Sequence, residues 1–284
     1  MSWDTHPTDM GLLHRPMSKY IWSDQDLAKL KQLILERDKI VIFPHTGPDG
    51  DALGSTLAWA GLLRSAHPGA SVHVISPDPV ESYLAWLPAL DELVIFPLEE
   101  ERSLQLIAEA DLIFHLDHNQ ISRLRYPRLV EAATSAQAPR VLIDHHLYPE
   151  AGFDLTFSYA NASATSELIH ALALALGWRS AITPDLATLL LTGIITDTGR
   201  FMYSHLSPEL FVTTSDLLAL GADYLHVIDR LSYHNPEVQI RLQGYVLDQK
   251  LELYPELRAA CITLTQEELR RFGASKGDTE GLVN

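Results

Sequence analysis

Residues 40–55 read IVIFPHTGPDGDALGS, and the fold of the chain is decided by this stretch. Four β-branched or aromatic apolar residues come first, which is typical of a short buried strand. A loop rich in proline and glycine follows, and residues 52–64 then form an apolar segment of helical length. A strand, a loop and a helix in this order predict one unit of an α/β fold.

The same pattern recurs along the chain. Short apolar runs alternate with stretches of helical character, such as residues 99–110. Strands that are apolar throughout are typical of a parallel sheet that is covered by helices on both faces, and this is the fold class that we predict. A first helix is expected to begin after a cap at Ser23 and to end near residue 38. The further apolar runs lie at 72–75, 93–96, 112–114 and 141–143.

The C-terminal third of the chain has a different pattern. Helical stretches dominate residues 166–244, two strands are expected at 250–254 and 257–264, and a short helix at 266–272. These elements predict a second, smaller α/β domain. The expected organisation is an N-terminal extension (1–22), a sheet domain (23–206), a helical linker (207–236) and the small domain (237–284).

Composition and charge limit the classes of function. The chain has 284 residues, a formal net charge of −16 and one cysteine, Cys261, which we expect to be a buried thiol. A single cysteine excludes an internal disulfide and a four-thiolate metal site, and it fits a reducing, cytoplasmic compartment. Residues 1–22 lack the apolar core of a signal peptide, and no apolar run is long enough for a membrane span. The acidic balance argues against tight binding of long duplex nucleic acid, but not against small phosphorylated substrates.

Acidic and histidine residues follow the predicted strands at their carboxyl ends, where open parallel sheets bind ligands. Gly47 and Gly50 allow a tight loop after the first strand, so that side chains from a seven-residue stretch can converge. Asp197 instead ends an apolar helix predicted at 186–195. The candidate residues are His45, Asp49 and Asp51 after the first strand, Asp117 after residues 112–114, and Asp144, His145 and His146 after residues 141–143.

Crowded carboxylates repel one another unless positive charge lies between them. Four of them, Asp49, Asp51, Asp117 and Asp197, would match the charge of two divalent cations. Imidazole together with carboxylate ligands suits manganese, with magnesium less favoured, and a pair of such ions is a standard clamp for phosphoryl chemistry. Spacing alone does not separate Asp117 from its neighbours Asp111 and His118. The remaining histidines that we considered are expected to be packed core residues, namely His73, His115, His170 and His226.

These motifs together resemble those of the DHH superfamily of phosphoesterases. Residues 45–55 are similar to its first motif, Asp117 and Asp197 match the aspartates of its second and fourth motifs, and residues 144–146 are the triplet that names it. Residues 161–167 resemble the bacterial oligoribonuclease (nanoRNase) and phosphoadenosine-phosphate (pAp) phosphatase branch. Residues 277–284 resemble part of the DHHA1 domain, although its glycine-rich motif does not follow here.

The resemblance implies a role for each candidate. His45, Asp49 and Asp117 would hold one metal ion, and Asp51, Asp117, His145 and Asp197 the other, with Asp117 bridging. Asp144 would orient its neighbours, and His146 would face the substrate phosphate. Arg200 and His205 could contact that phosphate or could equally be ordinary surface or ion-pair residues. Ser166 is a further candidate for a substrate contact.

The resemblance also implies an activity. We expect a manganese-dependent phosphodiesterase and phosphatase that hydrolyses short oligoribonucleotides and converts pAp to AMP and phosphate. Four other enzymes of the superfamily stay open, namely a cyclic-dinucleotide phosphodiesterase, a linear-dinucleotide phosphodiesterase, a RecJ-like single-strand exonuclease and a family II inorganic pyrophosphatase. The alternative that is not an enzyme is a catalytically silent nucleotide-binding protein. Whether the chain forms a homodimer is left open.

Overall fold

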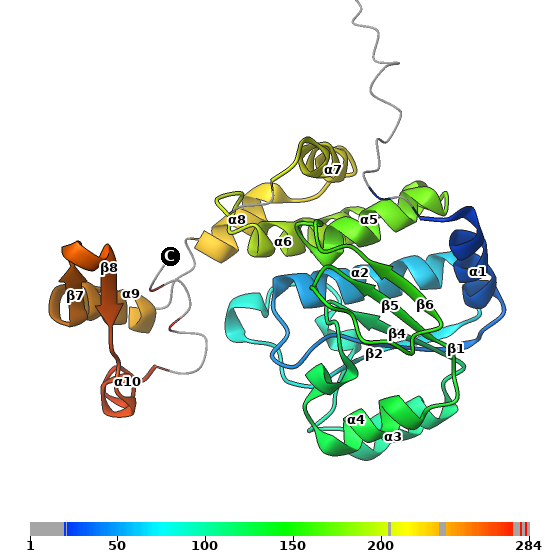
Figure 1. The fold of residues 1–284 in the computed structure, drawn as a ribbon, viewed down its shortest axis with the longest axis horizontal. Coiled ribbons are helices and arrows are strands. Elements are labelled where there is room, and N and C mark those ends of the chain that lie inside the picture. The colour runs from blue at the N-terminus through cyan, green and yellow to red at the C-terminus, as the bar shows by residue number, and fades with distance from the viewer. Residues whose placement is uncertain are drawn as a thin grey trace, which may run out of the picture.

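The structure is a computed structural model that describes residues 20, 22–203, 206–232, 237–274, 279 and 282. Its centre is a six-stranded sheet in which all neighbouring strands are parallel, in the order β3-β2-β1-β4-β5-β6 (Figure 1). The predicted parallel sheet is therefore confirmed. The strands are β1 (Lys39–Phe43), β2 (Ser71–Ser76), β3 (Leu93–Ile95), β4 (Leu112–Leu116), β5 (Arg140–Asp144) and β6 (Leu155–Ser158).

The edge strand β6 was not predicted. It has only four residues, and Thr156 is exposed between the buried side chains of Leu155 and Phe157. A segment this short carries too little pattern to be recognised without its neighbour β5, with which it pairs from Val141↔Leu155 to Asp144↔Ser158. Its presence extends the sheet by one strand and does not change the fold class.

Helices cover both faces of the sheet (Figure 1). Alternate residues of β1 show this, because Ile40 and Ile42 belong to one core cluster and Val41 and Phe43 to the other. The first cluster lies under α1 (Asp24–Leu35), α2 (Gly50–Ala66), α5 (Thr165–Ala175) and α6 (Pro184–Asp197), and the second under α3 (Glu100–Glu109) and α4 (Pro127–Ser135).

Two further helices extend the layer of α5 and α6. They are α7 (Pro208–Ala219) and α8 (Tyr224–Ser232), within the segment expected as a linker. Leu210, Leu217 and Val227 are fully buried in the larger core cluster, so both helices are packed on the sheet domain. Where the domain boundary lies remains a prediction.

The C-terminal elements form a separate small layer. They are α9 (Glu237–Tyr245), a π-helical turn (Val246–Lys250), the antiparallel pair β7 (Leu251–Tyr254) and β8 (Ala259–Ile262), and α10 (Gln266–Phe272). A small C-terminal sheet and helix are thus confirmed. Cys261, however, is exposed and not buried, because the side chains of this two-stranded sheet are largely open to solvent. Within the described residues, no helix is both long and apolar enough to cross a membrane.

The order of the strands creates a crevice at the centre of the sheet. The chain proceeds from β1 through β2 to β3 on one side and from β4 through β5 to β6 on the other, so β1 and β4 are the neighbours at which the direction reverses. Ligands bind at this position in open α/β sheets, beyond the carboxyl ends of the strands. Phe43 pairs with His115, so His45 and Asp117 each lie two residues beyond paired positions. The fold therefore brings the first and second motifs together.

Candidate metal centre

Six residues that were predicted to bind metal converge at the carboxyl edge of the sheet. Together with His146, which was predicted to face the substrate, they form three groups, and within each group the donor atoms all lie within 4.8 Å of one another. Asp117 belongs to two of these groups and His145 also belongs to two. The groups are His45, Asp49 and Asp117; Asp51, His145 and Asp197; and Asp117, His145 and His146.

The loop after β1 presents the Nε2 atom of His45 to the site. Nδ1 of His45 lies 2.8 Å from the carbonyl oxygen of Thr46, which can only accept a hydrogen bond, so the ring proton belongs on Nδ1. Nε2 instead faces the carboxylates, 3.5 Å from Oδ2 of Asp117 and 3.9 Å from Oδ1 of Asp49, and it can bind a cation once that cation displaces its proton. An imidazole held in this tautomer is ready to bind a cation.

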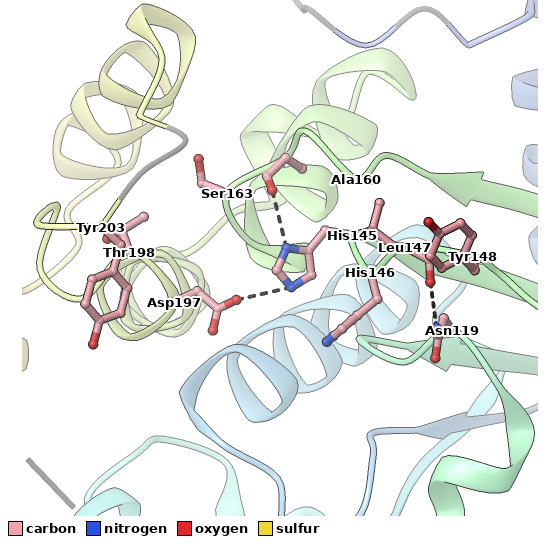
Figure 2. Close-up of a pocket in the computed structure, with 11 residues that line it drawn as sticks. Asn119, His145, His146, Leu147, Tyr148, Ala160, Ser163, Asp197, Thr198 and Tyr203 are labelled. Carbon is pink, nitrogen blue, oxygen red and sulfur yellow. Dashed lines mark hydrogen bonds and ion pairs between the residues drawn. The ribbon is translucent and has the colours of Figure 1, made fainter. Parts of the chain in front are cut away.

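His145 is oriented in the same way at the end of β5. Its Nδ1 faces the carbonyl of Ala162 at 3.3 Å, and its Nε2 lies 3.4 Å from Asp117 and 3.1 Å from Asp197 (Figure 2). Metal-binding histidines commonly donate their second ring nitrogen to a carbonyl, which sets the ring orientation. Both histidines therefore direct Nε2 at Asp117, from opposite sides of the switch between β1 and β4.

The first residues of α5 hold the side chain of Asp51 in place. Its two carboxylate oxygens accept hydrogen bonds from the backbone amides of Thr165 at 2.5 Å and Ser166 at 2.8 Å. The N-terminus of a helix favours a negative charge at this place. The hydroxyl of Thr165 also donates to Asp117 at 3.0 Å, so this residue connects two of the candidate ligands. Thr165 was missed as a site residue, although it lies within residues 161–167, the stretch that resembles the family.

Asp78, which follows β2, was also missed. One of its carboxylate oxygens accepts hydrogen bonds from the backbone amide of Gly47 at 2.7 Å and from the hydroxyl of Thr46 at 2.5 Å. Its other oxygen accepts one from the hydroxyl of Tyr126 at 2.9 Å. Asp78 thus holds the turn at Gly47, whose φ is 60°. No local motif in the sequence indicates this role, because residues 47 and 78 meet only in the folded sheet.

Asp144 and His146 form a pair beside the metal ligands. Oδ1 of Asp144 accepts a hydrogen bond from Nδ1 of His146 at 2.8 Å, which leaves Nε2 of His146 free. Asp144 is fully buried, whereas 38% of the side chain of His146 is exposed at the cavity. This geometry matches the orienting role expected of Asp144 and the substrate-facing role expected of His146, and both roles remain proposals.

The electrostatics of the cluster require positive charge. Burial, together with the negative charges of Asp117 and Asp197, raises the pKa of Asp51 well above its ordinary value. Burial and the charges of Asp117 and Asp49 raise the pKa of Asp197 to about 6, although His145 opposes this. Burial opposes a charge on His45 as well, yet its hydrogen bond with Asp117 raises the pKa to about 9. Carboxylates that resist ionisation beside available imidazole nitrogens fit divalent cations, whose charge would remove the repulsion.

The structure separates Asp117 from the two neighbours that spacing left open. Asp111 accepts hydrogen bonds from the backbone amides of Asp38 and Lys39, at the opposite end of the sheet. His118 is fully buried and bonds to the carbonyl of Leu116 and to Nδ1 of His115. Neither belongs to the donor groups described above.

Two predicted substrate contacts lie elsewhere. Ser166 is fully buried and its backbone amide positions Asp51, while its contact with substrate stays a prediction. The guanidinium of Arg200 donates to the carbonyl of Leu231 at 3.3 Å. His205 lies outside the described residues.

Of the histidines expected in the core, His115 and His170 are buried. His170 pairs with Asp216. His226 is exposed on α8 and contacts the edge of the Trp86 ring, so the prediction of a core position was wrong for this residue.

A cavity of about 760 Å³ opens beside the candidate metal ligands (Figure 2). His145 and Asp197 form part of its wall, so a bound molecule can reach the donor cluster. The cavity is large enough for a small phosphorylated compound. The lining residues are Asn119, His145, His146, Leu147, Tyr148, Ala160, Ala162, Ser163, Asp197, Thr198 and Tyr203.

Comparison with known proteins agrees with this geometry. Residues 39–194 match the DHH family, N-terminal domain. The chain is 28% identical over 258 residues to the probable bifunctional oligoribonuclease and PAP phosphatase NrnA of Streptococcus mutans, covering 91% of this chain and 75% of that protein. It is 31% identical over 232 residues to the bifunctional oligoribonuclease and PAP phosphatase NrnA of Mycoplasma pneumoniae, covering 81% and 67%.

A solved structure has the same fold. The crystal structure of an exopolyphosphatase-related protein from Bacteroides fragilis matches with a TM-score of 0.88 and 34% identity, over 92% of this chain and 76% of that one. The family match extends over more than half of the chain and includes β1, β4 and β5, which carry the first three motifs. The chain therefore belongs to the DHH family.

Proposed function

We propose that the chain is a metal-dependent phosphoesterase that hydrolyses short oligoribonucleotides and converts pAp to AMP and phosphate. The observation that carries this proposal is the position of Asp117, whose carboxylate belongs to one donor group with His45 and Asp49 and to another with His145. A carboxylate shared in this way is suited to bridge two cations beside a cavity of substrate size.

His45, Asp49 and Asp117 would hold one divalent cation, and Asp51, Asp117, His145 and Asp197 the other. Two such ions would activate the attacking water and stabilise charge on the phosphoryl oxygens, and manganese suits the mixed imidazole and carboxylate donors. The protein itself supplies the fixed orientation of these groups. Buried or partly buried hydrogen bonds to backbone atoms orient His45, His145 and Asp51 without a ligand.

His146 is the residue that we assign to the substrate phosphate. Asp144 fixes its ring through Nδ1, so that Nε2 is available at the cavity to interact with a phosphoryl oxygen. Groups held in place before the reaction stabilise developing charge without reorganising, which is where most of the catalytic benefit arises in phosphoryl transfer. Arg200 stays a candidate for the phosphate, because its bond to the carbonyl of Leu231 uses one Nη2–H of a guanidinium that has five N–H donors.

The choice of substrates rests on the relatives from Streptococcus mutans and Mycoplasma pneumoniae, both of which carry the names of an oligoribonuclease and a PAP phosphatase. The net charge of −16 supports small substrates over long duplexes, since long nucleic acid is usually held by a basic surface. The DHH-type site, the cavity and the acidic balance together favour short, phosphorylated nucleotides.

The test is product analysis with the purified chain in manganese, and in magnesium as a comparison. RNA of two to five nucleotides, pAp, pyrophosphate and linear polyphosphate are offered at equal concentration. We expect nucleoside monophosphates from the RNA and AMP from pAp, with loss of both activities in a chelator. Asp117→Asn should be inactive and Asp91→Asn, at an exposed position outside the site, should be active. Turnover of pyrophosphate or polyphosphate alone would overturn the substrate assignment.

A further inference from the structure

Two tyrosines stand at the cavity on different segments of the chain. Tyr148 follows the triplet at the end of β5, and Tyr203 follows α6. Both line the cavity, and Figure 2 shows them on opposite sides of His145 and His146. Tyr148 is 83% exposed and Tyr203 is 47% exposed. A single exposed tyrosine is ordinary on a protein surface, so exposure alone assigns no role.

The segment that carries Tyr148 is held firmly despite its exposure. The side-chain amide of Asn119 donates to the carbonyl of Leu147 at 2.7 Å (Figure 2), and the backbone amide of Glu150 donates to the carbonyl of Asn119 at 2.7 Å. The carboxylate of Glu150 in turn accepts from the amide of Ile121 at 2.9 Å. Hydrogen bonds on both sides therefore fix Tyr148, whose φ of 59° is unusual for a residue with a side chain.

The segment that carries Tyr203 is equally constrained. Gly199, Arg200 and Phe201 have φ values of 54°, 61° and 63°, and this left-handed turn returns the chain so that the amide of Tyr203 donates to the carbonyl of Thr198 at 3.0 Å. The tyrosine ring lies directly over Gly199, where an added Cβ would meet ring carbons at 2.5 Å. Left-handed residues other than glycine persist only where the surroundings hold them, and they cluster at ligand sites.

The composition of the cavity wall shows what the rings can bind. None of its lining residues, all of which are described, is a lysine or an arginine, so the charge of a phosphate would be met at the histidines and at cations held by the candidate ligands. The largest apolar surfaces that the wall offers to a group attached to the phosphate are the two aromatic rings and Leu147, which is 62% exposed. A ligand that carries a phosphate and flat aromatic groups would use both the charge-binding groups and the tyrosine rings. A nucleotide is such a ligand.

We propose that Tyr148 and Tyr203 are stacking platforms for nucleobases on the two sides of the scissile phosphate. The inference rests on the proposed function and adds the residues that recognise the bases. Each tyrosine receives one base, so a dinucleotide places its phosphate between them, at the donor cluster. Stacking accepts every base, because each has a flat aromatic face, and recognition is therefore independent of sequence.

The experiment compares Tyr148→Leu, Tyr203→Leu and the ring-preserving controls Tyr148→Phe and Tyr203→Phe in the manganese-loaded protein. Tyr224→Leu is a matched control, because Tyr224 is also exposed but does not line the cavity. The substrates are one diribonucleotide and its two analogues with an abasic ribose at the 5′ or the 3′ position. We expect each leucine variant to lower kcat/KM on the diribonucleotide by about tenfold or more. On the abasic analogue that lacks the base stacked on the replaced tyrosine, a leucine variant should be as active as the parent protein. Tyr148→Leu should show this with one of the two analogues and Tyr203→Leu with the other.

Equal losses on all three substrates, or no loss in either leucine variant, would overturn the stacking assignment. A second measurement is independent of turnover. Calorimetry of AMP and of ribose 5-phosphate should show a preference for AMP in the parent protein that a leucine variant loses and both phenylalanine variants keep. If the parent does not hydrolyse RNA but still prefers AMP, the proposed activity fails and the stacking sites stand. If it binds both compounds equally, the stacking sites fail.

Discussion

Oδ1 of Asp144 accepts a hydrogen bond of 2.8 Å from Nδ1 of His146, and this contact joins a fully buried carboxylate to a half-exposed ring at the cavity. On the proposed role of Asp144, which is to position His146, we expect Asp144→Asn to lower turnover by about 10–100-fold while the metal ions stay bound. His146→Ala should likewise keep the metals. Titration calorimetry with manganese, together with kcat for pAp, checks both.

A double-variant cycle sharpens this prediction. If Asp144 positions His146, Asp144→Asn should have little further effect in the background of His146→Ala. Full additivity of the two losses would show that Asp144 works independently of the histidine. Loss of a metal ion in His146→Ala would make this residue a ligand and not a substrate contact.

Asp117 is expected to be the most sensitive carboxylate. Its oxygens lie 3.5 Å from Nε2 of His45 and 3.4 Å from Nε2 of His145, so its charge serves both donor groups. Asp117→Asn should reduce manganese binding at both sites and lower kcat/KM by more than about 100-fold, the upper range for outer partners of metal ligands. Metal analysis of the dialysed protein is the measurement. Retention of two ions per chain would contradict the bridging role.

Asp78 should control the affinity for metal without touching it. Asp78→Ala removes the acceptor for the amide of Gly47 and for the hydroxyls of Thr46 and Tyr126, which frees the loop that carries His45. We expect the manganese affinity to fall by about 10–100-fold. Tyr126→Phe removes only one of the three hydrogen bonds and should have a smaller effect. Equal effects of the two variants would show that the manganese affinity depends on the hydrogen bond with Tyr126 and not on those with the loop.

Gly193 allows α6 to approach Asp51 closely. A Cβ at this position would lie 2.1 Å from the hydroxyl oxygen of Ser166 and 2.5 Å from Oδ1 of Asp51. Gly193→Ala should therefore lower the free energy of unfolding by about 1–3 kcal/mol and weaken metal binding. Gly244→Ala is the matched control, since it lies in α9 with open space around it and should stabilise the protein by about 0.5–1 kcal/mol. Urea unfolding of both variants measures the difference.

The pair of Asp216 and His170 predicts a dependence of stability on pH. Hydrogen bonds from His170 and then from Arg179 hold the pKa of Asp216 well below its ordinary value of 3.8. A lowered carboxyl pKa stabilises the fold above the unfolded pKa, and the stabilisation is lost as the pH falls through the folded value. Asp216→Asn should thus cost about 1–2 kcal/mol at pH 7.

This cost should shrink as the pH falls below about 4, where the parent carboxyl begins to protonate in the unfolded chain. Urea unfolding at pH 7, 5 and 3.5 follows it, with the exposed Asp185→Asn as the control. A difference that grows towards low pH would exclude the carboxylate as the stabilising charge.

The sequence alone predicted five of the six strands of the parallel sheet and the residues that converge at the candidate site. Residues 40–43 and the other apolar runs are continuous and β-branched, so they predict buried parallel strands without reference to neighbours. His45, Asp49, Asp51, Asp117, His145 and Asp197 could be found because they follow those strands or end an apolar helix, where ligand sites form. Each of these patterns lies within a short stretch of the sequence, so it can be recognised without knowing which segments meet in the fold.

Tertiary structure alone decided which groups hold and surround those ligands. Asp78 reaches Gly47, and Thr165 reaches Asp51 and Asp117, across gaps of 31, 114 and 48 residues, and no local pattern carries such distances. Ser166 shows the same limit, because the burial of its side chain and the contact of its backbone amide with Asp51 could not be read from the motif. Burial and hydrogen-bond partners depend on which elements meet, and only the packed fold brings those elements together.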